Sequence, residues 1–129
     1  MLLAPQASLD DRVLDRYDAA LAIASRELAG ARQWNPGLKV RLVSEDHAFA
    51  KTELAYLRER LKLPLKEPGP TPGALTLDFR TARRLPGGRI AMDAGVGYRP
   101  RGGFMAHYVV QPNVGPLGTV VRRTVFIEF

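Results

Sequence analysis

Two stretches in the first half of the chain repeat apolar residues at helical spacing. The first predicts a helix over about 9–32, with Ser8 as its N-cap. The second predicts a helix over about 45–62 that follows Ser44 as its cap. The residues that recur at intervals of three and four are Leu14, Tyr17, Leu21, Ala24 and Leu28 in the first, and Ala50, Leu54, Leu57 and Leu61 in the second.

The rest of the chain alternates apolar and polar positions, which is typical of strands. One strand is predicted at 38–43, between the two helices. Four more are predicted at about 74–80, 89–97, 103–110 and 119–128, separated by turns rich in Pro and Gly. Because such short links join antiparallel neighbours, we expect an α+β fold. Two N-terminal helices would pack on a mainly antiparallel sheet of about five strands.

Alternation also divides the strand residues between two faces of the predicted sheet. The apolar set, which the helices would cover, is Leu75, Leu77, Phe79, Ile90, Met92, Phe104, Tyr108, Val110, Val125 and Ile127. The opposite face would carry Thr76, Asp78, Arg80, Asp93, His107, Arg122, Thr124 and Glu128. One solvated face is ordinary for an antiparallel sheet.

Length and composition indicate one domain, residues 1–129, which can bury a hydrophobic core. Within it we distinguish a helical half (1–63), a Pro/Gly-rich connector (64–73) and a β-rich basic half (74–129). The chain has no Cys, which excludes disulfides, thiol nucleophiles and Cys-ligated metals. The apolar runs are too short for a membrane span, and no signal peptide is visible, so we expect a cytoplasmic protein without a membrane partner.

Positive charge is concentrated after the connector, and there it is carried by arginine alone. Residues 68–129 contribute +5 of the net charge of +6, from eight Arg and three acids, Asp78, Asp93 and Glu128. Arg matches phosphate geometry better than Lys does, so this half favours a polyanion as partner. A genome-wide preference for Arg over Lys would explain the choice of cation, although not the scarcity of acids.

These charges predict a non-catalytic binding module for a polyanion, with nucleic acid favoured. Arginines on β-hairpin tips would hold phosphates, and an adjacent tyrosine would stack on a base. The candidate residues are Arg83, Arg84, Arg89, Tyr98, Arg99, Arg101 and Arg122. Arg122 and Arg123 are neighbours in a strand and must face opposite sides, so at most one of them joins a given patch.

Two alternatives stay open. The first is a structural or assembly protein that forms a homo-oligomer through its C-terminal strand, which is apolar on both faces over 124–129. Trp34 would be a lid on the core, or, if exposed, an interface anchor. The second is a small hydrolase or isomerase that uses Asp78, Asp93 and His107, for which cross-strand ion pairing is the simpler explanation.

Other charged positions are expected to be solvated, and no cofactor or metal motif is present. Three cations, Lys51, Arg58 and Lys62, share one side of the second helix, and three acids, Asp11, Asp15 and Asp18, share one side of the first. Each set predicts an exposed helix face. The two histidines have no metal-ligand spacing; we expect His47 at the surface and His107 half-buried and hydrogen-bonded.

Overall fold

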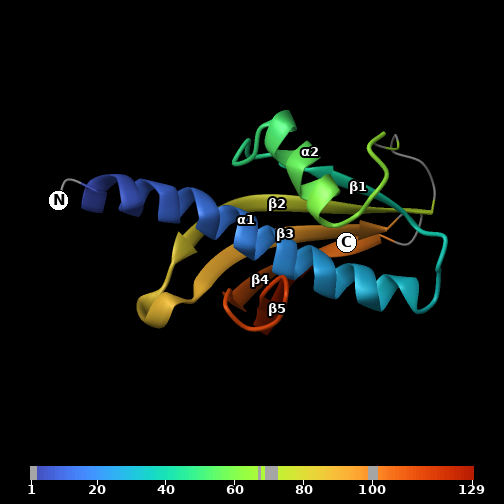
Figure 1. Cartoon of the computed structure of the whole chain (residues 1–129). Coiled ribbons are helices and arrows are strands. Elements are labelled where there is room, and N and C mark those ends of the chain that lie inside the picture. Colours follow the sequence, from blue (N-terminus) through green and yellow to red (C-terminus); the bar gives the residue numbers. More distant parts are fainter. Residues whose placement is uncertain (1–2, 67, 69–72, 99–101) are drawn as a thin grey trace.

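The fold is described by a computed structural model that covers the backbone of residues 3–66, 68, 73–98 and 102–129, with side chains from residue 14 onward. Two α-helices, a short 3-10 turn (Pro86–Gly88) and one sheet make up these residues (Figure 1). The elements are α1 (Leu3–Arg32), β1 (Lys39–Val43), α2 (Lys51–Arg60), β2 (Ala74–Arg84), β3 (Ile90–Tyr98), β4 (Gly102–Gln111) and β5 (Thr119–Glu128).

The strands lie in the sheet in chain order, β1-β2-β3-β4-β5. β1 is parallel to β2, because α2 and the connector return the chain to the same end of the sheet. The other three pairs are antiparallel, as their short turns require. This confirms the predicted α+β arrangement of two N-terminal helices on a mainly antiparallel five-stranded sheet.

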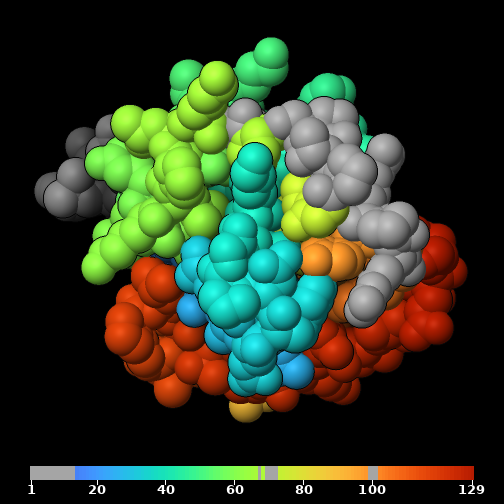
Figure 2. All heavy atoms as spheres, turned by 90° about the vertical axis from the view of Figure 1, so that its right-hand side faces the viewer, coloured from blue at the N-terminus to red at the C-terminus, as the bar shows by residue number. Residues whose placement is uncertain are grey.

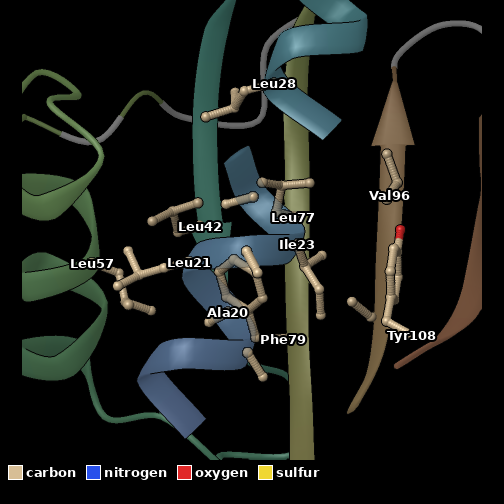
Figure 3. Packing of buried hydrophobic residues seen from close by; sticks show 14 of the residues in the cluster. Ala20, Leu21, Ile23, Leu28, Leu42, Leu57, Leu77, Phe79, Val96 and Tyr108 are labelled. Carbon is tan, nitrogen blue, oxygen red and sulfur yellow. The ribbon is translucent and has the colours of Figure 1, made fainter. Parts of the chain in front are cut away.

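Both helices cover the same face of the sheet, which leaves the other face open. α1 crosses the sheet diagonally, and α2 lies beside it over β1 (Figure 1). Ile23 of α1 and Leu57 of α2 are fully buried against Leu77 and Phe79 of β2 and Tyr108 of β4 (Figure 3). The core therefore lies between the helices and one face of the sheet, as the apolar alternation predicted.

Both helices begin at different residues from those expected. α1 begins at Leu3, so Ser8 lies within the helix and is not its N-cap. α2 begins only at Lys51, because the segment after Ser44 forms a turn first. The Ser44 hydroxyl accepts the Phe49 N–H at 3.2 Å and donates to the Phe79 carbonyl at 2.7 Å. Ser44 thus ties this turn to β2 and does not cap the helix.

Two β-bulges in β5 change the predicted face of its last residues. The register of β4 and β5 shifts between Met105 and Ala106, and again between Val109 and Val110. As a result Ile127 pairs with Met105 on the open face, while Glu128 pairs with Phe104 on the helix side. The prediction had these two residues reversed, because one extra residue in a strand exchanges the faces of all that follow.

Two charged residues expected at the surface are buried instead. Asp15 is 7% exposed and holds Arg84 of β2 through two bonds, Nε–Oδ2 at 3.0 Å and Nη2–Oδ1 at 2.9 Å. Arg58 is 4% exposed and donates to the carbonyls of Pro64 at 2.8 Å and Val40 at 2.7 Å. The predicted solvated helix faces are therefore wrong at these two positions, because each side chain fixes its helix to another part of the fold.

Two carboxylates fix α1 to its neighbours. Glu53 of α2 accepts from Arg16 at 2.9 Å and from the Tyr17 hydroxyl at 2.8 Å. Glu27 of α1 accepts from the buried Tyr108 hydroxyl at 2.7 Å and from Arg123 at 2.9 Å.

Within the part of the chain that the structure describes, neither helix combines the length and hydropathy of a membrane-spanning segment.

Candidate functional site

The open face of the sheet is the candidate functional surface. Strand alternation and register decide which residues it carries, since paired residues share a face. The charged members are Lys39 and Arg41 on β1, Asp78, Arg80 and Arg83 on β2, Asp93 on β3, and Arg122 on β5, with His107 on β4. Cations thus outnumber acids here and reach from the first strand to the last.

A hollow of about 770 Å³ lies in this face, and glycine is the reason for it. Gly95 and Gly97 of β3 line it without filling it, and Gly97 pairs with Gly103 of β4. A side chain on Gly103 would meet the Val96 carbonyl at 2.0 Å, whereas a Cβ on Gly97 would find only Thr76, at 3.9 Å. Gly103 is therefore needed by the fold, but Gly97 is not, and its missing side chain leaves the space empty.

The hollow has one cationic margin and an apolar end. Arg41 lines it from β1 and has no ion pair or hydrogen bond from its side chain to the other described residues. Met105 of β4, Ile127 of β5 and Phe129 line it on the side away from β1. Tyr98 also borders it, but its side chain is in register with Leu75 and meets Trp34 on the helix side of the sheet. The volume falls within the range of small-ligand pockets, about 300–1,000 Å³. A flat aromatic group and a neighbouring anion are the chemistry that this lining suits.

Asp78 and Arg80 close the remaining margin with an internal ion pair. The Arg80 Nη2 lies 2.6 Å from the Asp78 carboxylate, and the Glu45 N–H donates to that carboxylate at 2.9 Å. Burial raises the pKa of Asp78 above its ordinary value, although the Glu45 bond and Arg80 oppose the shift. Arg80 also lies 3.4 Å from Glu45, so its charge is matched within the chain. It is a poor candidate for binding a ligand.

Asp93 and His107 form a second pair on the open face, 2.7 Å apart from Oδ1 to Nδ1. They are direct cross-strand partners, and both side chains are half-buried, which agrees with the prediction for His107. A carboxylate in this position orients an imidazole, which is one requirement of general base catalysis. Neither residue lines the hollow of about 770 Å³, so this hollow does not present a substrate to the pair.

Two of the predicted binding residues lie on the open face. Arg83 pairs in register with Ala91, and Arg122 with Val109, so both side chains belong to this surface and both are exposed. Arg83 on β2 and Arg122 on β5 thus flank the buried residues Ala91 on β3 and Val109 on β4. Arg84, in contrast, belongs to the helix side, where Asp15 already holds its guanidinium.

The other predicted residues lie at the strand ends. Arg89 is exposed and donates to the Gln111 side chain at 3.3 Å. Tyr98 is half-buried and meets the Trp34 ring edge-on, with centroids 4.5 Å apart. Arg89 and Tyr98 border opposite ends of β3, so these two residues do not share one patch. Arg99 and Arg101 lie outside the described residues.

Sequence reasoning missed Lys39, Arg41 and the glycine floor. The alternation of 38–43 did indicate a strand with basic residues on one side. The alternation could not predict that this strand lies next to β2. That position brings the cations of the strand to the hollow. The repeated glycines at 95, 97 and 103 were a further signal, because alternate glycines in a strand leave one face without side chains.

Neither a metal site nor a similar protein indicates what this surface binds. Among the residues that the structure describes, no three His, Asp or Glu side chains are grouped closely enough to hold a metal ion. No protein-family model matches the chain, and no match was found among curated proteins or solved structures. The function must therefore be inferred from the surface itself.

Proposed function

We propose that this protein is a non-catalytic module that binds nucleic acid on the open face of its sheet. The observation that carries the proposal is the glycine-floored hollow, with Arg41 at its β1 margin and Phe129 on the opposite side. Phe129 offers a ring on which a base can stack, and Arg41 and the other cations of the open face offer partners for phosphates further along the same nucleic-acid strand. Stacking combined with a cationic surface is how proteins bind single strands without reading their sequence.

The balance of charge on this face supports a polyanion. The acids at this face and its hollow are Asp78, Asp93 and Glu45, and each already faces Arg80 or His107. Four cations, Lys39, Arg41, Arg83 and Arg122, make no ion pair within the described part of the chain. Neighbouring strands lie about 4.8 Å apart, so β2 and β5 hold Arg83 and Arg122 roughly 14 Å from each other. A nucleic-acid strand that crosses these β-strands would meet Arg83 on one side and Arg122 on the other.

The proposal differs from the sequence-based one in where the phosphates are held. The Arg84 guanidinium is already held by Asp15, and Arg89 and Tyr98 are separated by the length of β3. Arg83 and Arg122 are kept as candidates because both side chains lie on the open face, whereas the Tyr98 side chain lies on the helix side against Trp34. Arg41 joins them.

The direct test is fluorescence anisotropy with labelled single- and double-stranded DNA and RNA, from low to physiological salt. Replacing Arg41 and Arg122 together by Ala should weaken binding at least tenfold. It should also reduce the slope of log K against log salt, by about 0.7 for each lost contact to a single strand. The matched control is Arg26→Ala with Arg32→Ala, two exposed arginines of α1 in the other layer. Equal losses in both double variants would refute a site on the open face.

A second variant tests the hollow without changing charge. Gly97→Val adds a β-branched side chain where only Thr76 lies within 4 Å, so the fold should tolerate it. The new side chain fills the floor of the hollow, and binding should fall at least tenfold. Gly37→Val, in a turn where an added Cβ meets nothing within 4 Å, is the control. Unchanged binding by Gly97→Val would show that the hollow is not used.

A further inference from the structure

A second hollow lies on the helix side of the sheet, where α1 ends. Its volume is about 460 Å³, which is within the range of small-ligand pockets. In Figure 2, which faces this end of the molecule, the cyan atoms at the end of α1 lie beside the orange and red atoms of the strands. We call it the aromatic hollow, because the residues that line it include Trp34, Tyr98, Phe104 and Phe129.

Two of these rings form a corner. The Trp34 and Tyr98 rings have centroids 4.5 Å apart, and their planes meet at 77°. The Asn35 side-chain amide also donates to the Tyr98 hydroxyl, at 3.4 Å. Trp34 is 53% exposed, so it is not the lid on the core that its position first suggests. An exposed indole that is held nearly perpendicular to a second ring is the arrangement with which proteins enclose an organic cation.

Phe104 of β4 supplies a third ring, and this ring already accepts a cation. Phe104 pairs with Val96 and Glu128, so its side chain lies on the helix side of the sheet. The guanidinium carbon of Arg123 lies 5.0 Å from the Phe104 ring centroid, which is within the range of a cation–π contact. Arg123 does not itself line the aromatic hollow, so the hollow is left for another ligand.

The charge of the lining is opposite to that of the whole chain. Glu27 and Glu128 line the aromatic hollow, and none of the described residues around it is Lys or Arg, although the chain has a net charge of +6. Glu27 accepts from Tyr108 and from Arg123, so its charge is matched. Glu128 is exposed and makes no ion pair within the described residues. The lining therefore favours a cation and disfavours a phosphate.

Glycine leaves room for the ligand. Gly30, Gly102 and Gly103 line the aromatic hollow without side chains. An added Cβ on Gly102 would meet the Phe129 carbonyl oxygen at 2.1 Å, so the close approach of the strands requires glycine there. An added Cβ on Gly30 would meet nothing within 4 Å. The fold does not need glycine at position 30, and its missing side chain keeps the hollow open on the side of α1.

We propose that the aromatic hollow binds the quaternary ammonium group of a small molecule. Such a group carries its charge on methyl groups and donates no strong hydrogen bond, so aromatic faces suit it. A primary ammonium is strongly hydrated and needs acceptors, which the aromatic rings do not supply. The site lies on the helix side of the sheet, and the proposed nucleic-acid site lies on the open face. Binding to the aromatic hollow can therefore be measured without nucleic acid, and the two proposals can fail separately.

Trp34 is the single tryptophan of the chain, so its fluorescence reports directly on the aromatic hollow. Titration with choline at constant ionic strength should give a saturable change. The neutral isostere of choline, in which carbon replaces nitrogen, has the same shape without the charge and should bind at least tenfold more weakly. Free trimethyllysine and vesicles of phosphatidylcholine carry the same cationic group, and separate titrations identify the source that the site accepts. Saturation by none of the three, or equal affinity for the isostere, would overturn the proposal.

Two variants test the place of binding, with calorimetry as the assay. Trp34→Leu should weaken choline binding at least tenfold, whereas Tyr56→Leu should not change it. Tyr56 is the matched control because it is an aromatic residue, 44% exposed, that packs on one other tyrosine. Gly30→Leu should fill the aromatic hollow and also weaken binding at least tenfold. Its control is Ala29→Leu, at the preceding exposed position of α1, which does not line the hollow. Leucine is a good helix former, so both variants should fold.

A third variant tests the charge of the lining. Glu128→Gln should weaken choline binding by roughly two- to fivefold, as expected for one exposed carboxylate. Glu59→Gln, at an exposed position of α2 away from the aromatic hollow, should leave binding unchanged. Circular dichroism checks that each variant is folded. Choline binding that survives both Trp34→Leu and Gly30→Leu would lie elsewhere on the molecule and would refute this site.

Discussion

Replacing Arg58 by Met should lower the free energy of unfolding by about 2–3 kcal/mol. The substitution keeps much of the apolar stem and removes only the guanidinium. That group donates to the carbonyls of Pro64 at 2.8 Å and Val40 at 2.7 Å, and a third contact, to Lys66, is 3.5 Å long. It thus joins α2, the start of the connector and the edge of β1.

The magnitude follows from what each carbonyl loses. Val40 is 3% exposed, so its carbonyl would be left without a donor, at a cost of about 1–3 kcal/mol. Pro64 is exposed, and water can replace the arginine there at little cost. For a domain of this size the sum lowers the Tm by roughly 10 °C.

Urea denaturation followed by circular dichroism is the assay, with Arg60→Met as the matched control. Arg60 lies two residues further along α2 and is exposed, so its replacement should change stability by less than about 0.5 kcal/mol. If Arg58→Met were as stable as Arg60→Met, the guanidinium would not be holding β1.

Two further substitutions test the carboxylates that anchor α1. Tyr108→Phe removes a buried hydroxyl 2.7 Å from Glu27 and should cost about 1.5–2 kcal/mol in the same assay; a loss below about 0.5 kcal/mol would refute this role of the hydroxyl. The pKa of Glu53 is lowered, chiefly by the Ala50 N–H that donates to it and further by Tyr17 and Arg16. Its stabilisation is therefore full above the ordinary glutamate pKa and is lost as the pH falls through the lowered value. Glu53→Gln should accordingly be less stable than wild type near pH 7, and the difference should shrink below about pH 4; a difference independent of pH would refute the assignment.

The sequence predicted the elements and the layers because both follow from local periodicity. Every strand was placed to within a few residues, and the apolar set of β2, β3 and β4 does face the helices. These strands keep regular alternation near their centres. The same reasoning failed for Ile127 and Glu128, because a bulge in β5 is set by pairing with β4 and leaves no local signature.

The candidate surface was harder to predict because it depends on contacts between distant residues. Arg58 and Arg84 look like exposed cations in the sequence, and only the fold brings the Val40 carbonyl to one and Asp15 to the other. Arg41 was missed for the opposite reason. Its strand was predicted, but the neighbour of that strand, and with it the hollow beside Arg41, is a matter of topology.

The measurement that tests the central claim most directly is a ¹H–¹⁵N NMR titration of the protein with a short single-stranded oligonucleotide. The proposal predicts that the largest amide shifts fall on the floor and margin of the hollow, at Gly95, Gly97, Met105 and Arg41. Amides on the exposed side of α1, such as that of Arg26, should hardly move. Shifts centred on α1, or on the β2–β3 turn at 85–89, would contradict a nucleic-acid site on the open face of the sheet.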